Sequence, residues 1–324
     1  MTATEHADRR SVWGLWLRIG ISFVILGILL SRIHLGSVLP EGRSAALSVL
    51  AIIVGVLAAI GSIALGAFRW KQVFTAFGLS VRYRTLLNHY FAGQFLGNVL
   101  PSTIGGDVLR ISRATATTGS SEMAFSSVVL ERLTGFMALP VLSLAGLVLR
   151  PSLLDVRSGR VALLIDVVVI VLLGLILYAS GHPRLAGRFA AHDNWMRFIG
   201  AVHIGVDRLR RRPRHAAGVL GASLLYQASA MVVLYAAVRM LELPVPATAV
   251  LAVGPAVAML QVLPISLSGL GIREAALVLF LHPFGVTTSQ AVALGLIWYG
   301  LLLLASLLGA PSFAVGHGTK TPTS

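Results

Sequence analysis

Hydrophobic residues in this chain gather in runs long enough to cross a lipid bilayer. A helix of roughly 18 to 20 apolar residues spans the hydrocarbon core. Six runs approach or exceed that length, and each predicts a transmembrane helix. They lie at approximately Trp13–Leu30, Ala45–Phe68, Met123–Leu149, Val161–Ala179, Ala216–Val238 and Thr288–Gly309.

Two further apolar stretches are interrupted by residues that end helices. The first runs from about Asn88 to Thr115 and is broken at Pro101 and at Gly105-Gly106, and the second runs from about Val245 to Leu281 and is broken at Pro264 and at Ser268-Gly269. Broken backbone is not tolerated where it faces lipid. We therefore expect two re-entrant helical hairpins shielded by the other helices, with each second half-helix beginning at the glycines.

The two interrupted stretches share a motif. "NVLPSTIGGDVLR" begins at Asn98 and "QVLPISLSGLGIR" begins at Gln261, an offset of 163 residues. Each motif has an amide residue before Val-Leu-Pro, a glycine five positions after the proline and an arginine nine positions after it. An odd number of spans, about three, separates the two, so their mouths should open on opposite membrane faces. This pattern predicts an inverted repeat, with one copy at about 45–149 and the other at about 216–309. Two unrelated helix breaks are the alternative.

Composition places the whole chain in a membrane. Of its 324 residues, 56% are hydrophobic and 12% charged, and the mean hydropathy is +0.85. A soluble protein could not cover so much apolar surface. We expect an all-α polytopic protein with a single transmembrane domain over 1–324, a basic loop at 180–215 and a flexible tail at 310–324. The absence of cysteine and the scattered histidines favour no metal or other cofactor.

The basic residues indicate an orientation. With the N-terminus inside, 17 of them fall on the inner side and 7 on the outer side, while Arg18 and Arg132 lie in spans. Inner loops of bacterial-type plasma membrane proteins collect such residues, so we expect both termini in the cytoplasm. The formal charge of +14 is then explained by the membrane rather than by nucleic acid.

The segment 184–214 is strongly basic and has apolar residues at helical spacing. It predicts an amphipathic helix on the inner leaflet that binds anionic lipid. A solvated cytoplasmic loop is the alternative.

Charged residues inside a membrane are costly, so they usually form pairs or serve function. Three acids and three bases fall in or beside the broken stretches and the third run, and their balance suggests one closed network. Arginine is well suited to bind phosphate, and a carboxylate could pair with a head-group amine or relay protons. Alternatively, the six residues only anchor the hairpins. They are Asp107, Glu131, Glu274, Arg110, Arg132 and Arg273. Asp166, alone in its run, is expected to reach the membrane interface.

Three motifs in this order resemble the lysylphosphatidylglycerol synthase transmembrane-domain family of flippase-like membrane proteins. They are "NVLPSTIGGDVLR", "VVLERLTGF" and "LPISLSGLGIREAAL", and the resemblance extends over about Trp13–Gly309. It implies paired re-entrant hairpins and movement of lipids between leaflets. Carried over by motif, the substrate-binding residues are Asn98, Pro101, Ser102, Gly105, Gly106, Asp107, Arg110, Glu131, Arg132, Pro264, Ser266, Ser268, Gly269, Gly271, Arg273 and Glu274.

The resemblance leaves the substrate open. The best-known members move aminoacylated phosphatidylglycerol that a cytosolic domain has charged, but no such transferase sequence follows Gly309 here. A lipid-linked sugar is therefore an equal candidate. We expect a lipid flippase without enzyme activity. The alternatives are an intramembrane transferase acting on polyprenyl phosphate, or an accessory scaffold for a glycosyltransferase or lipid synthase. Formation of a homo-oligomer is left open.

Overall fold

In a computed structural model, residues 45–99, 103–181, 193–262 and 269–315 are described. They form helices joined by short turns and contain no β-strand, which confirms the all-α class for this part of the chain. The expected span at Trp13–Leu30 lies outside the described residues.

Five long helices carry the candidate membrane spans of the described residues. They are α2 (Ala45–Ala76), α5 (Ser121–Leu149), α6 (Arg157–Gly181), α9 (Pro213–Met240) and α12 (Thr288–Ser306). These helices match five of the six expected runs, and the protein is a multi-pass membrane protein. Their starts follow ordinary capping rules. The hydroxyl of Thr287 accepts a hydrogen bond from the Gln290 backbone N–H at the start of α12, and Pro213 occupies the first turn of α9.

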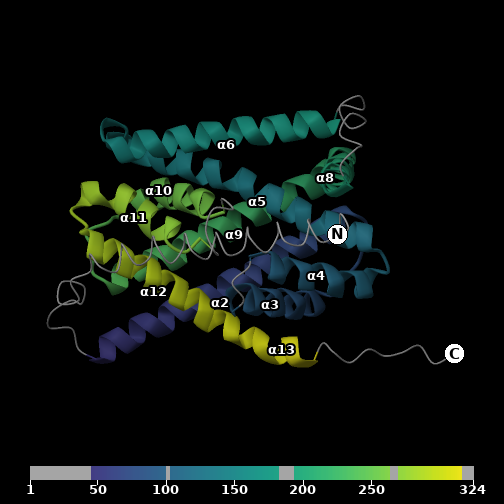
Figure 1. The fold of residues 1–324 in the computed structure, drawn as a ribbon, viewed down its shortest axis with the longest axis horizontal. Coiled ribbons are helices and arrows are strands. Elements are labelled where there is room, and N and C mark those ends of the chain that lie inside the picture. The colour runs from purple at the N-terminus through teal and green to yellow at the C-terminus, as the bar shows by residue number, and fades with distance from the viewer. Residues whose placement is uncertain (1–44, 100–102, 182–192, 263–268, 316–324) are drawn as a thin grey trace, which may run out of the picture.

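Two pairs of short helices occupy the interrupted stretches. The first pair is α3 (Tyr83–Val99) and α4 (Thr103–Thr118), and the second is α10 (Ala247–Leu260) and α11 (Ile272–Leu281). Members of each pair pack against each other. In Figure 1 the α3–α4 pair lies in the right half of the bundle and the α10–α11 pair lies in the left half. The two hairpins thus approach the middle from opposite ends.

The glycines of the two hairpins differ in their roles. Gly269 and Gly271 have φ angles of +76° and +84°, which L-residues rarely adopt, so the second break falls where it was expected. In the first hairpin the expected break at Gly105-Gly106 is wrong, because α4 begins at Thr103 and continues through both glycines. A side chain at Gly106 would overlap the carbonyl oxygen of Gly93 in α3. Gly106 therefore allows two helices to touch.

Helix packing occurs in corresponding pairs. The first helices of the two expected repeats, α2 and α9, pack against each other. Helix α5 packs against α10, as α12 packs against α3, and the pairs α4–α5 and α2–α3 correspond to α11–α12 and α9–α10. Gly146 near the end of α5 touches the backbone of Ala252 in α10, and Gly309 touches that of Phe91 in α3. Since 309 − 146 = 163, these two glycines have the offset of the repeated motif.

The remaining elements cover the ends and one side of the bundle. They are η2 (Pro151–Asp155), α8 (Asp193–Arg211), η3 (His282–Phe284), η4 (Leu307–Gly309) and α13 (Ala310–Val315). Helix α8 confirms a helix within the basic segment and packs on α5, α6 and α9.

Residues 310–315, expected to begin a flexible tail, instead form α13. The guanidinium of Arg113 in α4 donates to the carbonyl oxygens of Ser312 and Phe313, at 2.8 and 3.3 Å, and so ties α13 to the first hairpin.

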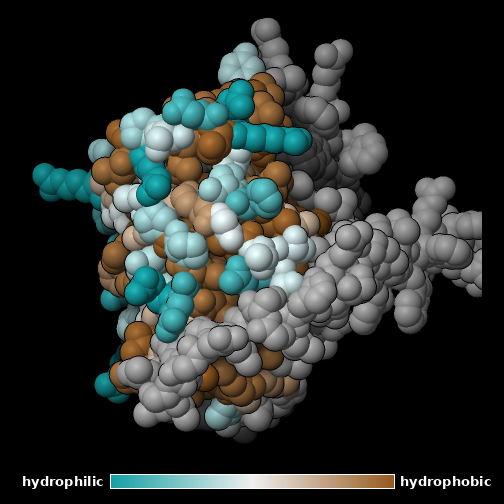
Figure 2. Space-filling model, turned by 90° about the vertical axis from the view of Figure 1, so that its left-hand side faces the viewer, coloured by the Kyte–Doolittle hydropathy of each residue, from teal (hydrophilic) through white to brown (hydrophobic). Residues whose placement is uncertain are grey.

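Apolar side chains are exposed along the sides of the long helices. In α6 they include Leu164, Leu172, Leu175 and Tyr178, each more than half exposed. Figure 2 looks onto the end of the bundle that lies at the left of Figure 1, where hydrophilic side chains gather among hydrophobic ones. An apolar side surface with polar ends is the distribution that a bilayer requires.

Candidate functional site

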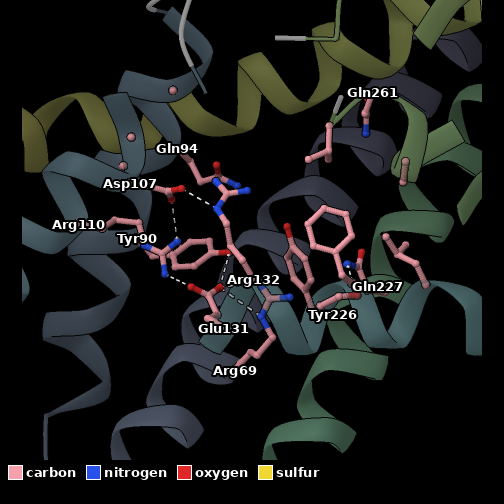
Figure 3. Close-up of a pocket in the computed structure, with 18 of the residues that line it drawn as sticks. Arg69, Tyr90, Gln94, Asp107, Arg110, Glu131, Arg132, Tyr226, Gln227 and Gln261 are labelled. Atoms are coloured by element: carbon pink, nitrogen blue, oxygen red, sulfur yellow. Dashed lines mark hydrogen bonds and ion pairs between the residues drawn. The ribbon is translucent and has the colours of Figure 1, made fainter. Parts of the chain in front are cut away.

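The tips of the two hairpins meet at a cavity of about 260 Å³ in the middle of the bundle (Figure 3). Asn98 near the end of α3 and Gln261 directly after α10 both line it. These are the amide residues that open the two matching motifs. The fold therefore brings equivalent positions of the two motifs, 163 residues apart, to one cavity.

A buried ionic cluster forms one wall of the cavity. Glu131 of α5 is fully buried, and its Oε1 accepts hydrogen bonds from Nε and a terminal nitrogen of Arg69 in α2, the former at 3.2 Å. Its Oε2 accepts a hydrogen bond from Arg110 of α4. The hydroxyl of Tyr90 also donates to Oε1, at 3.3 Å. Both oxygens of this carboxylate are thus occupied by protein groups.

Asp107 extends the cluster toward the open part of the cavity. Its Oδ2 accepts from Nε of Arg132 at 2.6 Å, and its Oδ1 lies 3.5 Å from a terminal nitrogen of Arg110. The Arg132 side chain is 46% exposed, whereas those of Arg69 and Arg110 are 6% and 7% exposed. Arg132 is therefore the cation of the cluster that a bound molecule can reach.

Aromatic rings hold the two buried arginines in place. The guanidinium carbon of Arg69 lies 4.1 Å from the ring centroid of Tyr226. That of Arg110 lies 4.3 Å from the centroids of both Trp70 and Tyr90. Such cation–π contacts are strongest where water is excluded, as it is here.

The sequence of α3 explains how the first hairpin presents this site. Tyr90, Gln94 and Asn98 are spaced four apart, which places them on one face of a helix, and all three line the cavity. Gly93 and Gly97 are likewise four apart and lie against Gly106 of α4. This small-residue spacing lets the helix backbones approach closely, as it does between many membrane helices.

The expectation of one network of six charges is wrong, because Arg273 and Glu274 form a separate buried pair. Nε of Arg273 donates to Oε1 of Glu274 at 3.0 Å, and Oε2 of Glu274 accepts the Gly271 backbone N–H at 2.7 Å. Glu274 is thus committed to the first turn of α11, where free N–H groups attract a carboxylate.

The separate pair still touches the first hairpin. Arg273 lies over the ring of Tyr299 in α12, 5.1 Å from its centroid. The hydroxyl of Tyr299 donates to the backbone carbonyl of Asn98 at 2.8 Å. The second motif therefore positions the tip of the first through one tyrosine.

The expected site residues fall into three groups. Those that line the cavity are Asn98, Gly106, Asp107, Arg110, Glu131 and Arg132. Gly105 lies within α4, and Gly269, Gly271, Arg273 and Glu274 lie at the start of α11, so these five are not among the lining residues. Pro101, Ser102, Pro264, Ser266 and Ser268 lie outside the described residues.

The sequence analysis missed Arg69, Gln94, Tyr226 and Gln227, which also line the cavity. Arg69 was assigned to the basic inner side because α2 was expected to end at Phe68. The available signal was the buried stripe of Trp70, Val73, Phe74 and Phe77, which continues the helical pattern past that point.

Asp166 of α6 also differs from expectation. It is fully buried rather than at the membrane interface, and neither carboxylate oxygen has a hydrogen-bond partner among the described residues. Within the same part of the chain, His, Asp and Glu form no cluster of three or more that could hold a metal ion.

These features define a helical, multi-pass membrane protein with a buried ionic cavity between two short hairpins. A family model described as the lysylphosphatidylglycerol synthase TM region matches residues 15–309, and the chain belongs to this family. The match confirms the resemblance carried by the three motifs. No curated protein matches the chain.

Proposed function

We propose that this protein moves a phosphate-containing lipid between the two leaflets of the membrane. The observation that carries the proposal is the convergence of Asn98 and Gln261, the first residues of two matching motifs, on one cavity with a reachable arginine. Family membership supports a role with membrane lipids. In this proposal the hairpins α3–α4 and α10–α11 are re-entrant from opposite leaflets, because none of their helices has the roughly 20 residues needed to span the bilayer.

The corresponding helix contacts support an inverted repeat. Two halves with the same internal packing can exchange contacts at little cost, since each arrangement resembles the other. The backbone contacts at Gly146 and Gly309 would guide the two halves as they rock. The proposal completes the bundle with a sixth span at Trp13–Leu30 and places both termini in the cytoplasm.

Arg132 is proposed to bind the lipid phosphate. Its Nε is held by Asp107, while its terminal nitrogens have no partner among the described residues and can form two parallel bonds to phosphate oxygens. The buried cluster of Glu131 with Arg69 and Arg110 keeps the helices in register around it. The acyl chains would stay in lipid while the head group passes through the cavity.

An intramembrane transferase is less well supported by the site. Acid–base catalysis would need a carboxylate that is free to exchange a proton with a substrate. Glu131 is occupied at both oxygens by arginines, and Asp107 is paired with Arg132 and Arg110. Lipid movement uses the arginine and requires no such group. A scaffold role for 184–214 remains a prediction.

Reconstitution tests the proposed function. Purified protein would be incorporated into liposomes that contain a trace of acyl-chain-labelled phospholipid, and transfer between leaflets would be followed by quenching from the outside. We expect transfer well above that of empty liposomes and of liposomes that hold an unrelated membrane protein. Transfer equal to both controls for every phosphate-containing lipid would overturn the proposal, and chemical conversion of the lipid would favour the transferase.

A further inference from the structure

The charge of the cavity bears on which head group it accepts. Arg69, Arg110 and Arg132 line it together with two acids, Glu131 and Asp107, and its other lining residues are uncharged, so the described lining carries one excess positive charge. Like charges in a site shielded from water repel strongly. A cationic head group would therefore enter against the field of the cavity.

Neither carboxylate is available to a cation. Glu131 accepts hydrogen bonds from Arg69, Arg110 and Tyr90, and is fully buried. Both oxygens of Asp107 face arginine nitrogens. A substrate ammonium would have to displace an arginine and leave it unpaired in a buried place, which is costly.

The aromatic rings of the cluster are occupied as well. Aromatic faces are the other common way to bind an amine. Tyr226 faces Arg69, while Trp70 and Tyr90 face Arg110. The means by which a protein holds a cationic group are used here by the protein's own arginines.

Uncharged hydrogen-bonding groups are what the cavity leaves free. The side-chain amides of Gln94, Asn98 and Gln261 have no partner in the described part of the chain, and they come from both hairpins. The amide nitrogen of Gln227 donates to the Gly135 carbonyl at 3.1 Å, which leaves its oxygen to accept. In Figure 3 Gln94 lies beside the Asp107 end of the cluster, and Gln227 and Gln261 lie on the other side of the cavity.

A carboxamide offers one acceptor and one donor group, which matches a hydroxyl that both donates and accepts. Resting on the function proposed above, we infer that the substrate head group carries a phosphate and several hydroxyl groups but no cationic amine. Arg132 would bind the phosphate, and the carboxamides from the two hairpins would bind the hydroxyls. The same chemistry occurs in the glycerol head group of a phospholipid and in a sugar linked to a lipid phosphate. An aminoacylated phospholipid lacks it, although the family description refers to one.

Competing lipids in one reconstituted system test this inference. The four probes are labelled phosphatidylglycerol, a polyprenyl-phosphate-linked hexose, lysylphosphatidylglycerol and phosphatidylethanolamine. We expect at least one of the first two to move about tenfold or more faster than either amine-bearing lipid, since unpaired polar groups and like charges each discriminate by such factors. Comparing the first two tells which source supplies the hydroxyls.

A charge-changing variant makes the test sharper. Gln261→Glu adds a carboxylate that is not already paired with an arginine, and should shift the rate ratio at least about tenfold toward lysylphosphatidylglycerol. Gln261→Leu should slow the hydroxylated lipid without helping the amine-bearing ones. Asn98→Asp places the same change in the other motif and serves if Gln261→Glu does not yield folded protein.

The outcomes separate the two proposals. Wild-type transfer of lysylphosphatidylglycerol or phosphatidylethanolamine at rates equal to or above those of both hydroxylated lipids would overturn the inference alone. An unchanged ratio in both folded carboxylate variants would do the same. No transfer of any of the four lipids would instead count against the proposed function.

Discussion

Arg69 of α2 donates two hydrogen bonds to Glu131 of α5, a residue 62 positions later in the chain. Arg110 of α4 binds the second oxygen of the same carboxylate. One buried acid therefore joins three helices through two buried bases. Breaking such an arrangement on one side leaves an uncompensated charge inside the protein.

We expect Glu131→Gln to destabilise the fold severely. Arg69 and Arg110 would stay buried without a counter-charge, at a cost of about 3–5 kcal/mol. The thermal unfolding midpoint of the purified protein in detergent measures this loss. Glu122→Gln on the same helix is the matched control, since Glu122 is exposed. Equal midpoints for Glu131→Gln and the wild type would show that the cluster does not hold the helices together.

Arg132→Gln should preserve the fold and abolish lipid transfer. The side chain is 46% exposed, and Asp107 keeps Arg110 as a neighbour after the change. Losing a charged, two-pronged phosphate contact should slow transfer about tenfold or more. Transfer in liposomes and elution as a single species on gel filtration are the paired measurements. Arg211→Gln, which removes an exposed pair with Asp207 on α8, should leave transfer unchanged. Normal transfer by folded Arg132→Gln would remove Arg132 from the site.

Alanine at Gly106 should loosen the first hairpin. The added methyl group overlaps the backbone of Gly93, so α4 must move away from α3. The unfolding midpoint should fall, whereas Gly221→Ala in α9, where the new methyl group meets open space, should stay level or rise because alanine favours helices. If both variants behave alike, the contact between α3 and α4 is not close enough to need glycine.

The repeat makes a related prediction for Gly146 and Gly309. Each lies against the backbone of the opposite hairpin, in α10 and α3 respectively. Gly146→Ala and Gly309→Ala should therefore lower the unfolding midpoint by similar amounts and slow lipid transfer together. A large effect in only one of them would speak against equivalent roles in two halves.

Asp166→Leu should raise the unfolding midpoint. The carboxyl group is fully buried and has no hydrogen-bond partner among the described residues, which costs about 1–3 kcal/mol relative to an apolar group of similar size. Asp155→Leu at an exposed position of η2 is the control. A lower midpoint for Asp166→Leu than for the wild type would mean that the carboxyl group stabilises the fold.

Much of the architecture was readable from the order of residues. Run length predicted the five long helices of the described part, Pro101 and Pro264 pointed to the two interrupted stretches, and three motifs identified the family. These features are local. Backbone hydrogen bonds must be satisfied within each segment that enters lipid, so the sequence of a segment largely decides its conformation.

The composition of the site was only partly readable. Intramembrane charge singled out Asp107, Arg110, Glu131 and Arg132, which the fold does bring together. It also grouped Arg273 and Glu274 with them, although that pair belongs to the start of α11. Charge balance predicts that partners exist, but it does not say which ones meet.

The sequence by itself thus determined the helices, their breaks and the family, whereas the tertiary structure decided which charges share the cavity. Arg69 illustrates the division. Its position near the end of an apolar run fits a loop cation, and only the packing of α2 against α5 turns it into the partner of Glu131. The physical reason is that helical periodicity fixes the face of one helix on which a residue lies, while a buried charge is placed by the neighbours on other helices that neutralise it.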